Sequence, residues 1–336
     1  MTEILLLIIS LGVILLGAEL FVNGVEWLGK LFDLSEGAVG SVLAAVGTAL
    51  PETLIPIIAI IFGQEKAGHE IGIGAILGAP LMLSTLAMFV TGVAVVGFRH
   101  KRTHGIKVVA DYNTMSRDLL FFVIVFAVAV LAGMIPPEYR FIQLIIALVL
   151  VAGYIWYVWV LLNEDRHNGE DEDMPVCYFA RSYDEPPRYR VFLQVIIALG
   201  FIIYGANLFV DSVYHIAILY SVPAFVLALI ITPIATELPE KLNSVIWISR
   251  EKDTLALGNI TGAMVFQSSL IPALGIFLTD WQLTSSALLV ALLALTSAGF
   301  LYLELKNKKH ISAWMLLLAG AFYVVFLVAV FQGYIR

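Results

Sequence analysis

The stretch Gly47-Thr48-Ala49-Leu50-Pro51-Glu52 recurs as Ala235-Thr236-Glu237-Leu238-Pro239-Glu240, and both copies lie inside apolar segments of membrane-spanning length. Each copy places a glutamate directly after a proline, at a depth where lipid would surround a membrane helix. An ionisable side chain at that depth is costly and usually serves a function. The two matched copies therefore predict a cation site built from Glu52 and Glu240. The alternative is that the prolines are ordinary kinks and the glutamates are protonated, hydrogen-bonded packing residues.

The composition is that of a membrane protein. Of 336 residues, 60% are hydrophobic and 13% are charged, and the mean hydropathy is +0.94. A soluble domain carries about a quarter charged residues. Crossing a bilayer core takes about 20 apolar residues. We therefore predict an all-α integral membrane protein with ten spans, near residues 4–29, 38–62, 71–97, 118–134, 141–162, 191–218, 222–248, 255–279, 284–304 and 312–334.

The basic residues predict the orientation of these spans. Of the 19 Lys and Arg residues, Lys241 lies inside a predicted span. Because successive spans cross the membrane in alternate directions, Lys66, Arg140 and Arg336 fall on one side of the membrane and the remaining fifteen on the other. Lys and Arg concentrate in cytoplasmic loops. We therefore expect a multi-pass protein of the plasma membrane with both termini outside the cytoplasm.

An acidic, proline-containing stretch divides the predicted spans into two groups of five. We expect residues 1–163 and 191–336 to form two halves, joined by a cytoplasmic linker at residues 164–190. One interpretation of the linker is a solvated connector, and the other is a low-affinity cation collector or regulatory loop.

An internal repeat supports this division. Residues 17–23 (GAELFVN) match residues 205–211 (GANLFVD) at an offset of 188, which is also the offset of the two Leu-Pro-Glu segments; residues 74–79 (GAILGA) answer residues 258–263 (GNITGA) at an offset of 184. A unit with an odd number of spans must enter the membrane from opposite faces in its two copies. The pattern predicts two inverted five-helix repeats, whose second and seventh helices are broken.

The prolines predict how these helices break. Pro51 cannot donate a hydrogen bond to the carbonyl of Gly47, nor Pro239 to that of Ala235, so each helix is expected to open by about a turn. Backbone oxygens exposed in this way, together with two carboxylates, suit a hard cation such as Ca²⁺ or Na⁺ better than zinc or copper.

The chain resembles the cation/Ca²⁺ exchanger superfamily, which includes Na⁺/Ca²⁺ and H⁺/Ca²⁺ exchangers. That family carries Gly-Thr-Ser-x-Pro-Glu motifs in its second and seventh helices and Gly-Asn-x-x-Gly-Ser motifs in its third and eighth. The matching residues here are 47–52, 235–240, 74–80 and 258–264. The resemblance implies that Glu52 and Glu240 are the central ion-binding carboxylates, and that Thr48 and Thr236 complete the coordination together with backbone carbonyls such as those of Gly47 and Ala235.

The departures from the family pattern concern ion selectivity. Pro80 and Met264 stand where Na⁺/Ca²⁺ exchangers have a side chain with an oxygen, which makes strict exchange for three Na⁺ doubtful. Glu237 is an additional acid, and Lys241 follows it at the i+4 spacing that brings two side chains together on one helix face. The pair is either a structural salt bridge, or a place where the ammonium replaces a bound Na⁺ or answers proton coupling.

Further polar residues of the same helices are candidate ligands. Asn259 and Gln267 could supply amide oxygens from the eighth helix, although each could equally make an interhelical hydrogen bond. The glycines at positions 74, 78, 258 and 262 are expected to let helices approach closely.

We therefore predict a secondary active antiporter and not an enzyme, since no nucleotide-binding loop or Ser/His/Asp grouping occurs in the sequence. It is expected to exchange a divalent cation, Ca²⁺ above all, for H⁺ or Na⁺ by alternating access, without a cofactor. Its expected partners are inorganic cations and the bilayer, with a homodimer left open. The alternatives are an exchanger of the same fold for Mg²⁺, Mn²⁺ or K⁺, and a non-transporting or channel-like relative whose site Lys241 neutralises.

Overall fold

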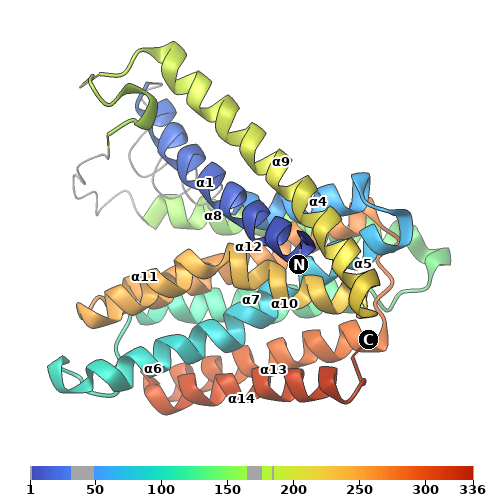
Figure 1. Cartoon of the computed structure of the whole chain (residues 1–336). Helices are drawn as coiled ribbons and strands as arrows, with labels where there is room; N and C mark the ends of the chain where they lie inside the picture. The colour runs from blue at the N-terminus through green and yellow to red at the C-terminus, as the bar shows by residue number, and fades with distance from the viewer. Residues whose placement is uncertain (1, 32–48, 165–175, 184, 336) are drawn as a thin grey trace.

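The computed structural model describes residues 2–31, 49–164, 176–183 and 185–335, and these are overwhelmingly helical (Figure 1). In this part of the chain eight helices are long and apolar enough to span a membrane, and two shorter apolar helices cover Leu50–Phe62 and Ala224–Ile234. The predicted all-α membrane fold is confirmed. Eight of the ten predicted spans coincide with a full-length helix, while the spans predicted at 38–62 and 222–248 contain the two shorter helices.

The helices that precede the acidic linker begin with one long helix. They are α1 (Thr2–Leu31), α4 (Leu50–Phe62), α5 (Glu65–Met82), the π-helical turn η2 (Leu83–Ala87), α6 (Met88–Phe98), α7 (Tyr112–Ala132) and α8 (Arg140–Glu164). The elements α5, η2 and α6 follow one another without a break and together cross the predicted third span.

A similar order of elements follows the linker. The helices are α9 (Arg188–Tyr220), α10 (Ala224–Thr236), α11 (Leu238–Ser249), α12 (Asp253–Leu278), α13 (Ser285–Lys308) and α14 (Ala313–Phe331). Three single 3-10 turns are η3 (Arg99–Lys101), η4 (Pro137–Tyr139) and η6 (Tyr178–Ala180), and two short strands, β1 (Lys107–Val108) and β2 (Ile311–Ser312), pair antiparallel.

Polar residues at the helix ends explain several of these boundaries. The side chains of Asp111, Thr284 and Ser312 each accept a hydrogen bond from a backbone N–H in the first turn of α7, α13 and α14, respectively. Such caps satisfy donors that have no partner within the helix. The hydrogen bonding from Thr114 also lowers the pKa of the Asp111 carboxyl.

The helices α1 and α9 form a pair that lies across the rest of the molecule (Figure 1). Glycines permit the close approach, because a Cβ at Gly17 would lie 2.8 Å from Ile202 and a Cβ at Gly205 would lie 2.8 Å from Ile14. The Gln194 amide donates to Leu20 O and to Asn23 Oδ1, both at 2.9 Å. Backbone packing and a buried amide network thus join the two helices.

The remaining helices enclose the main core. Its largest fully buried side chains include Phe122 and Phe126 from α7, and further members come from the elements α5 to α7 and α10 to α14. The glycine contacts expected of α5 are confirmed, since a Cβ at Gly74 would lie 2.5 Å from Phe225 O and one at Gly78 would lie 2.6 Å from Leu229 O. Backbone therefore packs on backbone where α5 crosses α10.

The glycines of α12 differ from those of α5. No described atom lies within 4 Å of a Cβ built on Gly258 or Gly262. At the repeat offset of 188, the segment that corresponds to α10 is residues 36–48, which lie outside the described residues. The expected close approach at these two glycines therefore stays a prediction.

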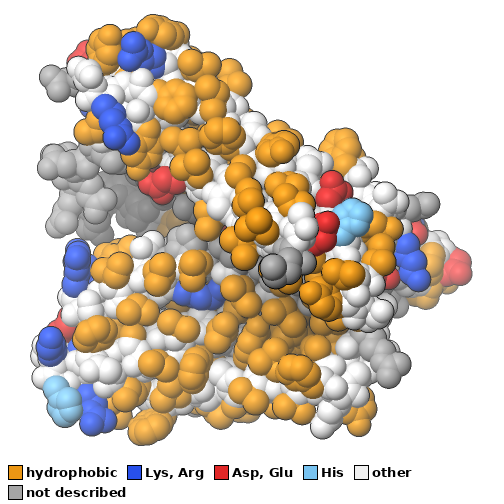
Figure 2. Space-filling model, in the orientation of Figure 1, with side chains coloured by type: hydrophobic (Ala, Val, Ile, Leu, Met, Phe, Trp, Pro, Cys, Tyr) orange, Lys and Arg blue, Asp and Glu red, His pale blue; other side chains and the backbone are white. Residues whose placement is uncertain are grey.

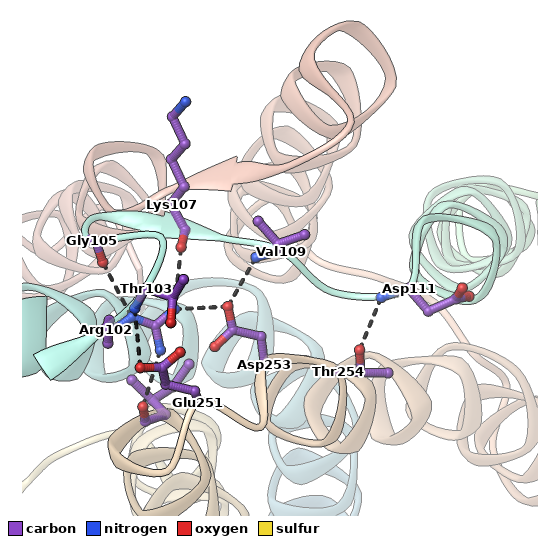
Figure 3. Close-up of polar contacts among 10 residues, drawn as sticks. Arg102, Thr103, Gly105, Lys107, Val109, Asp111, Glu251, Asp253 and Thr254 are labelled. Carbon is purple, nitrogen blue, oxygen red and sulfur yellow. Dashed lines mark hydrogen bonds and ion pairs between the residues drawn. The ribbon is translucent and has the colours of Figure 1, made fainter.

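A buried arginine fastens one end of the bundle, which we call the Arg102 end (Figure 3). The Arg102 guanidinium lies 2.7 Å from Asp253 Oδ2 and also donates to the carbonyls of Gly105, Lys107 and Ile248. The same Asp253 oxygen accepts from Val109 N at 2.9 Å. Loops that are about 150 residues apart in sequence are thus held together at one buried ion pair.

Neighbouring contacts extend this junction. Thr103 N donates to Glu251 at 3.0 Å, and Asp111 N donates to the Thr254 hydroxyl at 3.0 Å. Hydrogen bonding from Thr103 lowers the pKa of the Glu251 carboxyl. The lowered pKa stabilises the folded chain at neutral pH, and this stabilisation is lost as the pH falls through the lowered value.

One interpretation of the sequence was that the linker is a solvated connector. The described end of the linker is instead partly buried. Cys177 is fully buried with Trp27, Ala180 and Val191, and its Sγ lies 3.4 Å from Gln194 Oε1. The Tyr178 N–H donates to Asn23 Oδ1 at 3.1 Å. The chain entering α9 therefore packs against both α1 and α9, and hydropathy did not reveal this because the segment is short and mixed in character.

The surface agrees with a membrane environment. Figure 2 shows hydrophobic side chains over the middle of the molecule, with most of the charged side chains toward its ends. Trp156, Trp159, Phe201 and Phe331 are among many large apolar side chains that are exposed. Patches of this extent are stable only where lipid or another apolar surface covers them.

Candidate cation-binding site

Glu52 lies in the first turn of α4, a half-length helix that begins at Leu50. Pro51 occupies one of the first two positions of this helix, where a missing N–H costs nothing and the fixed φ favours helix initiation. The glutamate is only 6% exposed, and its Oε2 is buried without a hydrogen-bond partner. The positive end of the helix dipole stabilises the negative charge at this position.

Glu240 has the equivalent place in α11, which begins at Leu238. It is half-buried, and one of its carboxylate oxygens, Oε2, is buried without a hydrogen-bond partner. Each glutamate thus lies at the N-terminus of a half-length helix. These two N-termini occupy corresponding positions in the sequence repeat. The Glu52 carboxylate interacts electrostatically with Glu240, with Lys241 and with the Thr236 hydroxyl.

A break between α10 and α11 interrupts the predicted seventh helix. A single residue, Glu237, leaves the helical conformation, with φ −97° and ψ 11°. Its N–H still donates to Pro233 O at 3.2 Å, and Lys241 N donates to Glu237 O at 3.3 Å. The expected break of the seventh helix beside Pro239 is therefore present, with Glu237 between two half-helices that are each wound.

Glu237 and Lys241 add two more charges to this place. Glu237 is 2% exposed, and both of its carboxylate oxygens are buried without a hydrogen-bond partner. The Lys241 ammonium lies 3.8 Å from Glu237 Oε2 and donates to Pro233 O at 3.2 Å. The i+4 pair that the sequence predicted is present. Glu237 also interacts electrostatically with Glu52 and Glu240.

The other predicted ligands are distributed as follows. Gly47 and Thr48 lie outside the described residues. Ala235 and Thr236 form the last turn of α10, where the buried Thr236 hydroxyl donates to Thr232 O at 3.1 Å. Asn259 in α12 has a buried Nδ2 without a hydrogen-bond partner, and Gln267 is buried further along the same helix.

Pro80 and Met264, the two departures from the family pattern, are both buried. Pro80 precedes the π-helical turn η2, where the Ser84 hydroxyl donates to Pro80 O at 2.7 Å and Ser297 donates to Ser84 O at 2.6 Å. π-helical turns inside α-helices are frequent at functional sites.

Four carboxylate oxygens without hydrogen bonds are therefore gathered in one buried region: Oε2 of Glu52, both oxygens of Glu237 and Oε2 of Glu240. Buried polar atoms normally have partners, so these oxygens suit a cationic ligand. Within the described residues, however, no three His, Cys, Asp or Glu side chains converge closely enough to form a metal centre by themselves. Oxygens from other groups are needed to complete a coordination shell.

Sequence reasoning missed a buried polar cluster formed by residues of α7, α8 and α12. Asp118 of α7 accepts hydrogen bonds from the Thr261 hydroxyl at 2.8 Å and from the Tyr157 hydroxyl at 2.9 Å. Arg117 Nε lies 3.7 Å from Asp118 Oδ1. The sequence signal was that Asp118 is the first residue of a predicted span. A carboxylate at that position cannot be told from a solvent-exposed loop residue until the neighbouring helices are known. Tyr323 of α14, an electrostatic neighbour of Glu237, was also missed, because the two residues lie far apart in sequence.

A family model described as sodium/calcium exchanger protein matches residues 2–163 and 190–332. This chain belongs to the sodium/calcium exchanger family. It is 25% identical over 332 residues to an uncharacterized membrane protein of Methanocaldococcus jannaschii, a match that covers 96% of this chain and 97% of the relative. It is 21% identical over 328 residues to the putative antiporter CaxA of Alkalimonas amylolytica, covering 95% of this chain and 97% of the relative.

Solved structures of exchangers share the fold of this family member. The H⁺/Ca²⁺ exchanger CAX superposes with a TM-score of 0.70 at 19% identity, covering 98% of this chain and 82% of CAX. The sodium-calcium exchanger NCX_Mj superposes with a TM-score of 0.57 at 21% identity, covering 97% of this chain and 98% of NCX_Mj. The family consists of transporters and not enzymes, as the sequence predicted.

Proposed function

We propose that this exchanger-family protein is a secondary active antiporter that moves a divalent cation, Ca²⁺ above all, in exchange for H⁺ or Na⁺. The observation that carries the proposal is the set of four carboxylate oxygens without hydrogen-bond partners at the N-terminal ends of α4 and α11. Ca²⁺ takes six to eight oxygen ligands, among them carboxylates, carbonyls and amides. The structural relatives, an H⁺/Ca²⁺ exchanger and a sodium-calcium exchanger, agree with this cargo.

The ligand set that we propose centres on Glu52 and Glu240, with Glu237 beside them. Thr236 is the polar neighbour of Glu52, and Asn259 of α12 is proposed to offer its side-chain Oδ1. Backbone carbonyls near Gly47 and Ala235, and the Thr48 hydroxyl, are proposed to complete the shell. Gln267 is proposed to modulate binding from the same helix.

Coupling follows from competition for the carboxylates. A proton on Glu52 or Glu240 removes the charge that holds the metal, so that protons entering from one side release the cation. Ca²⁺ and the driving ion then occupy the site alternately. We propose that the α1–α9 pair, which lies outside the main core and packs on α4, α5 and α10, changes its position as access alternates.

The placement of the protein in the cell is proposed from the sequence. The fifteen-to-three distribution of Lys and Arg supports a plasma-membrane protein with both termini outside the cytoplasm, so that the Arg102 end is cytoplasmic. The two halves, residues 1–163 and 191–336, are proposed to be inverted repeats, and the exchanger acts as a monomer or a homodimer.

The decisive experiment is ⁴⁵Ca²⁺ uptake into proteoliposomes with a Na⁺ gradient and a pH gradient imposed separately. Uptake that depends on either gradient supports the proposal and identifies the driving ion. Competition by Mg²⁺, Mn²⁺ and K⁺ in the same vesicles separates Ca²⁺ from the alternative cargoes.

The second candidate function is a non-transporting relative, which the buried Lys241 beside Glu237 favours. Under this alternative the ammonium neutralises the site permanently. Protein-containing vesicles would then accumulate no Ca²⁺ above the level of empty vesicles under either gradient.

A further inference from the structure

The Lys241 ammonium lies among the carboxylates of the proposed cation site and not at its edge. It is 6% exposed, donates to Pro233 O at 3.2 Å and lies 3.8 Å from Glu237 Oε2. Its other electrostatic neighbours are Glu240 and Glu52. Backbone carbonyls at broken helices, such as that of Pro233, are also groups that bind a Na⁺ or K⁺ ion in a membrane protein.

The geometry differs from that of a closed structural salt bridge, and the chain itself offers two comparisons. Lys308 and Glu304 form an i,i+4 pair of the same kind at 2.8 Å, and Arg102 and Asp253 form a buried pair at 2.7 Å. At 3.8 Å the Lys241 pair is too long for a hydrogen bond, and both Glu237 oxygens remain without one. Glu237 therefore keeps its full capacity to accept a ligand while the ammonium stays beside it.

The side chain of Lys241 is also held in place. Its ammonium is buried, whereas the Lys308 side chain is 57% exposed and reaches solvent. A lysine ammonium is a compact point charge with three donors and no acceptor, so it satisfies oxygen ligands as a small monovalent cation does. Because its stem is covalently attached to α11, it cannot leave with the cargo.

From this geometry we propose that Lys241 is a tethered cation that occupies the place of one monovalent ion in the site and thereby determines ion selectivity. This rests on the proposed exchange function and specifies its cargo. Glu52, Glu237 and Glu240 together carry three negative charges when ionised, and Lys241 supplies one positive charge. The remaining two charges match one divalent cation or two monovalent ones, and they leave no place for a third Na⁺.

The test removes this charge and measures Na⁺ directly. Equilibrium binding of ²²Na⁺ to the detergent-solubilised protein, and Na⁺ inhibition of ⁴⁵Ca²⁺ binding, are compared for the wild type and Lys241→Gln. We expect Lys241→Gln to gain ²²Na⁺ binding, because the third carboxylate charge is no longer balanced. We also expect Na⁺ to inhibit ⁴⁵Ca²⁺ binding to this variant at a concentration about tenfold lower than for the wild type. Lys241→Arg keeps the positive charge and is expected to stay as insensitive as the wild type.

Two further variants separate charge from general damage. Glu237→Gln with Lys241→Gln restores a net charge of two negatives, and we expect it to lose the added Na⁺ binding. Lys308→Gln removes the ammonium of the exposed i,i+4 pair and is expected to change nothing. The tethered-cation role would be contradicted if Lys241→Gln showed the same ²²Na⁺ binding and Na⁺ inhibition as the wild type. It would also be contradicted if the double variant bound ²²Na⁺ as strongly as Lys241→Gln alone.

These outcomes are distinguishable from failure of the exchange function itself. If the wild type binds and moves no Ca²⁺, the proposed function is wrong, whatever ²²Na⁺ does. If the wild type transports Ca²⁺ and already binds Na⁺ as strongly as Lys241→Gln does, the exchange function stands and the tethered-cation role is overturned. The elution volume in size-exclusion chromatography confirms that each variant is folded before binding is measured.

Discussion

At the scale of single residues, the site is a concentration of unsatisfied charge. Glu52, Glu237 and Glu240 contribute carboxylate oxygens that accept no hydrogen bond from a described donor, and Lys241 compensates for one of the three charges. A protein tolerates such a group in its interior when a ligand supplies the missing partner. The loss of one charge therefore affects ion binding more than folding.

Glu52→Gln and Glu240→Gln are each expected to reduce gradient-driven ⁴⁵Ca²⁺ uptake to the background of protein-free liposomes. Neither substitution removes a hydrogen bond from the unpartnered oxygen, so the thermal midpoint in detergent should be unchanged or slightly higher. Glu237→Gln is expected to reduce uptake less, because Lys241 already balances that charge. Equal losses in all three variants would contradict this ranking.

Thr261→Val removes the hydroxyl that donates to the buried Asp118 carboxylate. Leaving one carboxylate oxygen without its donor should lower the unfolding free energy by about 1–3 kcal/mol, measured by thermal unfolding in detergent. Thr296→Val is the matched control, because its hydroxyl donates only to the carbonyl one turn earlier in an exposed part of α13. A comparable loss in both variants would show that Asp118 does not depend on Thr261.

At the scale of elements, the contact between α5 and α10 sets the distance between the predicted third helix and the half-helix that ends at Glu237. Glycine is required at the crossing, since a Cβ at position 78 would meet Leu229 O and also the Pro233 ring at 2.8 Å. Pro233 carries the carbonyl that holds Lys241. Widening this crossing should therefore disturb the site as well as the packing.

Gly78→Val is expected to destabilise the protein by about 1–3 kcal/mol through overpacking and to weaken ⁴⁵Ca²⁺ binding. The control is Gly97→Val, because no described atom lies within 4 Å of a Cβ at that position. Thermal unfolding and equilibrium ⁴⁵Ca²⁺ binding are measured on both. Full Ca²⁺ affinity in Gly78→Val would show that the crossing does not position the Pro233 carbonyl.

At the scale of the whole molecule, the Arg102 end joins loops from remote parts of the chain, while the α1–α9 pair packs through its own contacts and through an apolar cluster shared with α4, α5 and α10. The junction includes β1 and β2, which bring the segment before α7 to the start of α14. The fold thus consists of a helix bundle joined at the Arg102 end and the α1–α9 pair packed beside it. This arrangement fits the proposed alternating access.

Arg102→Ala should lower the unfolding free energy by about 3–5 kcal/mol, because it leaves the buried Asp253 carboxylate unpaired. Arg102→Met combined with Asp253→Leu should recover part of that loss, since neither charge then remains buried. Arg99→Ala is the control, because Arg99 is exposed and its Nε donates to the adjacent His100. Thermal unfolding of all three variants in detergent measures the effect, and an Arg102→Ala midpoint equal to that of Arg99→Ala would contradict it.

The amino-acid sequence by itself determined the membrane fold, the family and the residues at the centre of the site. Hydropathy is a property of consecutive residues, so apolar segments could be located without knowing their neighbours. The recurrence of Pro-Glu at a fixed offset likewise needed no coordinates to draw attention to Glu52 and Glu240. The i+4 spacing of Glu237 and Lys241 could be predicted because a helix fixes the distance between such positions.

Only the tertiary structure decided which of these groups lack partners and which residues far apart in sequence meet. The single-residue break at Glu237, the Pro233 carbonyl that holds Lys241, the Thr261 donor of Asp118 and the junction of Arg102 with Asp253 all depend on how helices pack. Local patterns do not encode such contacts, because the partners lie far apart in sequence or depend on small shifts of backbone between packed helices.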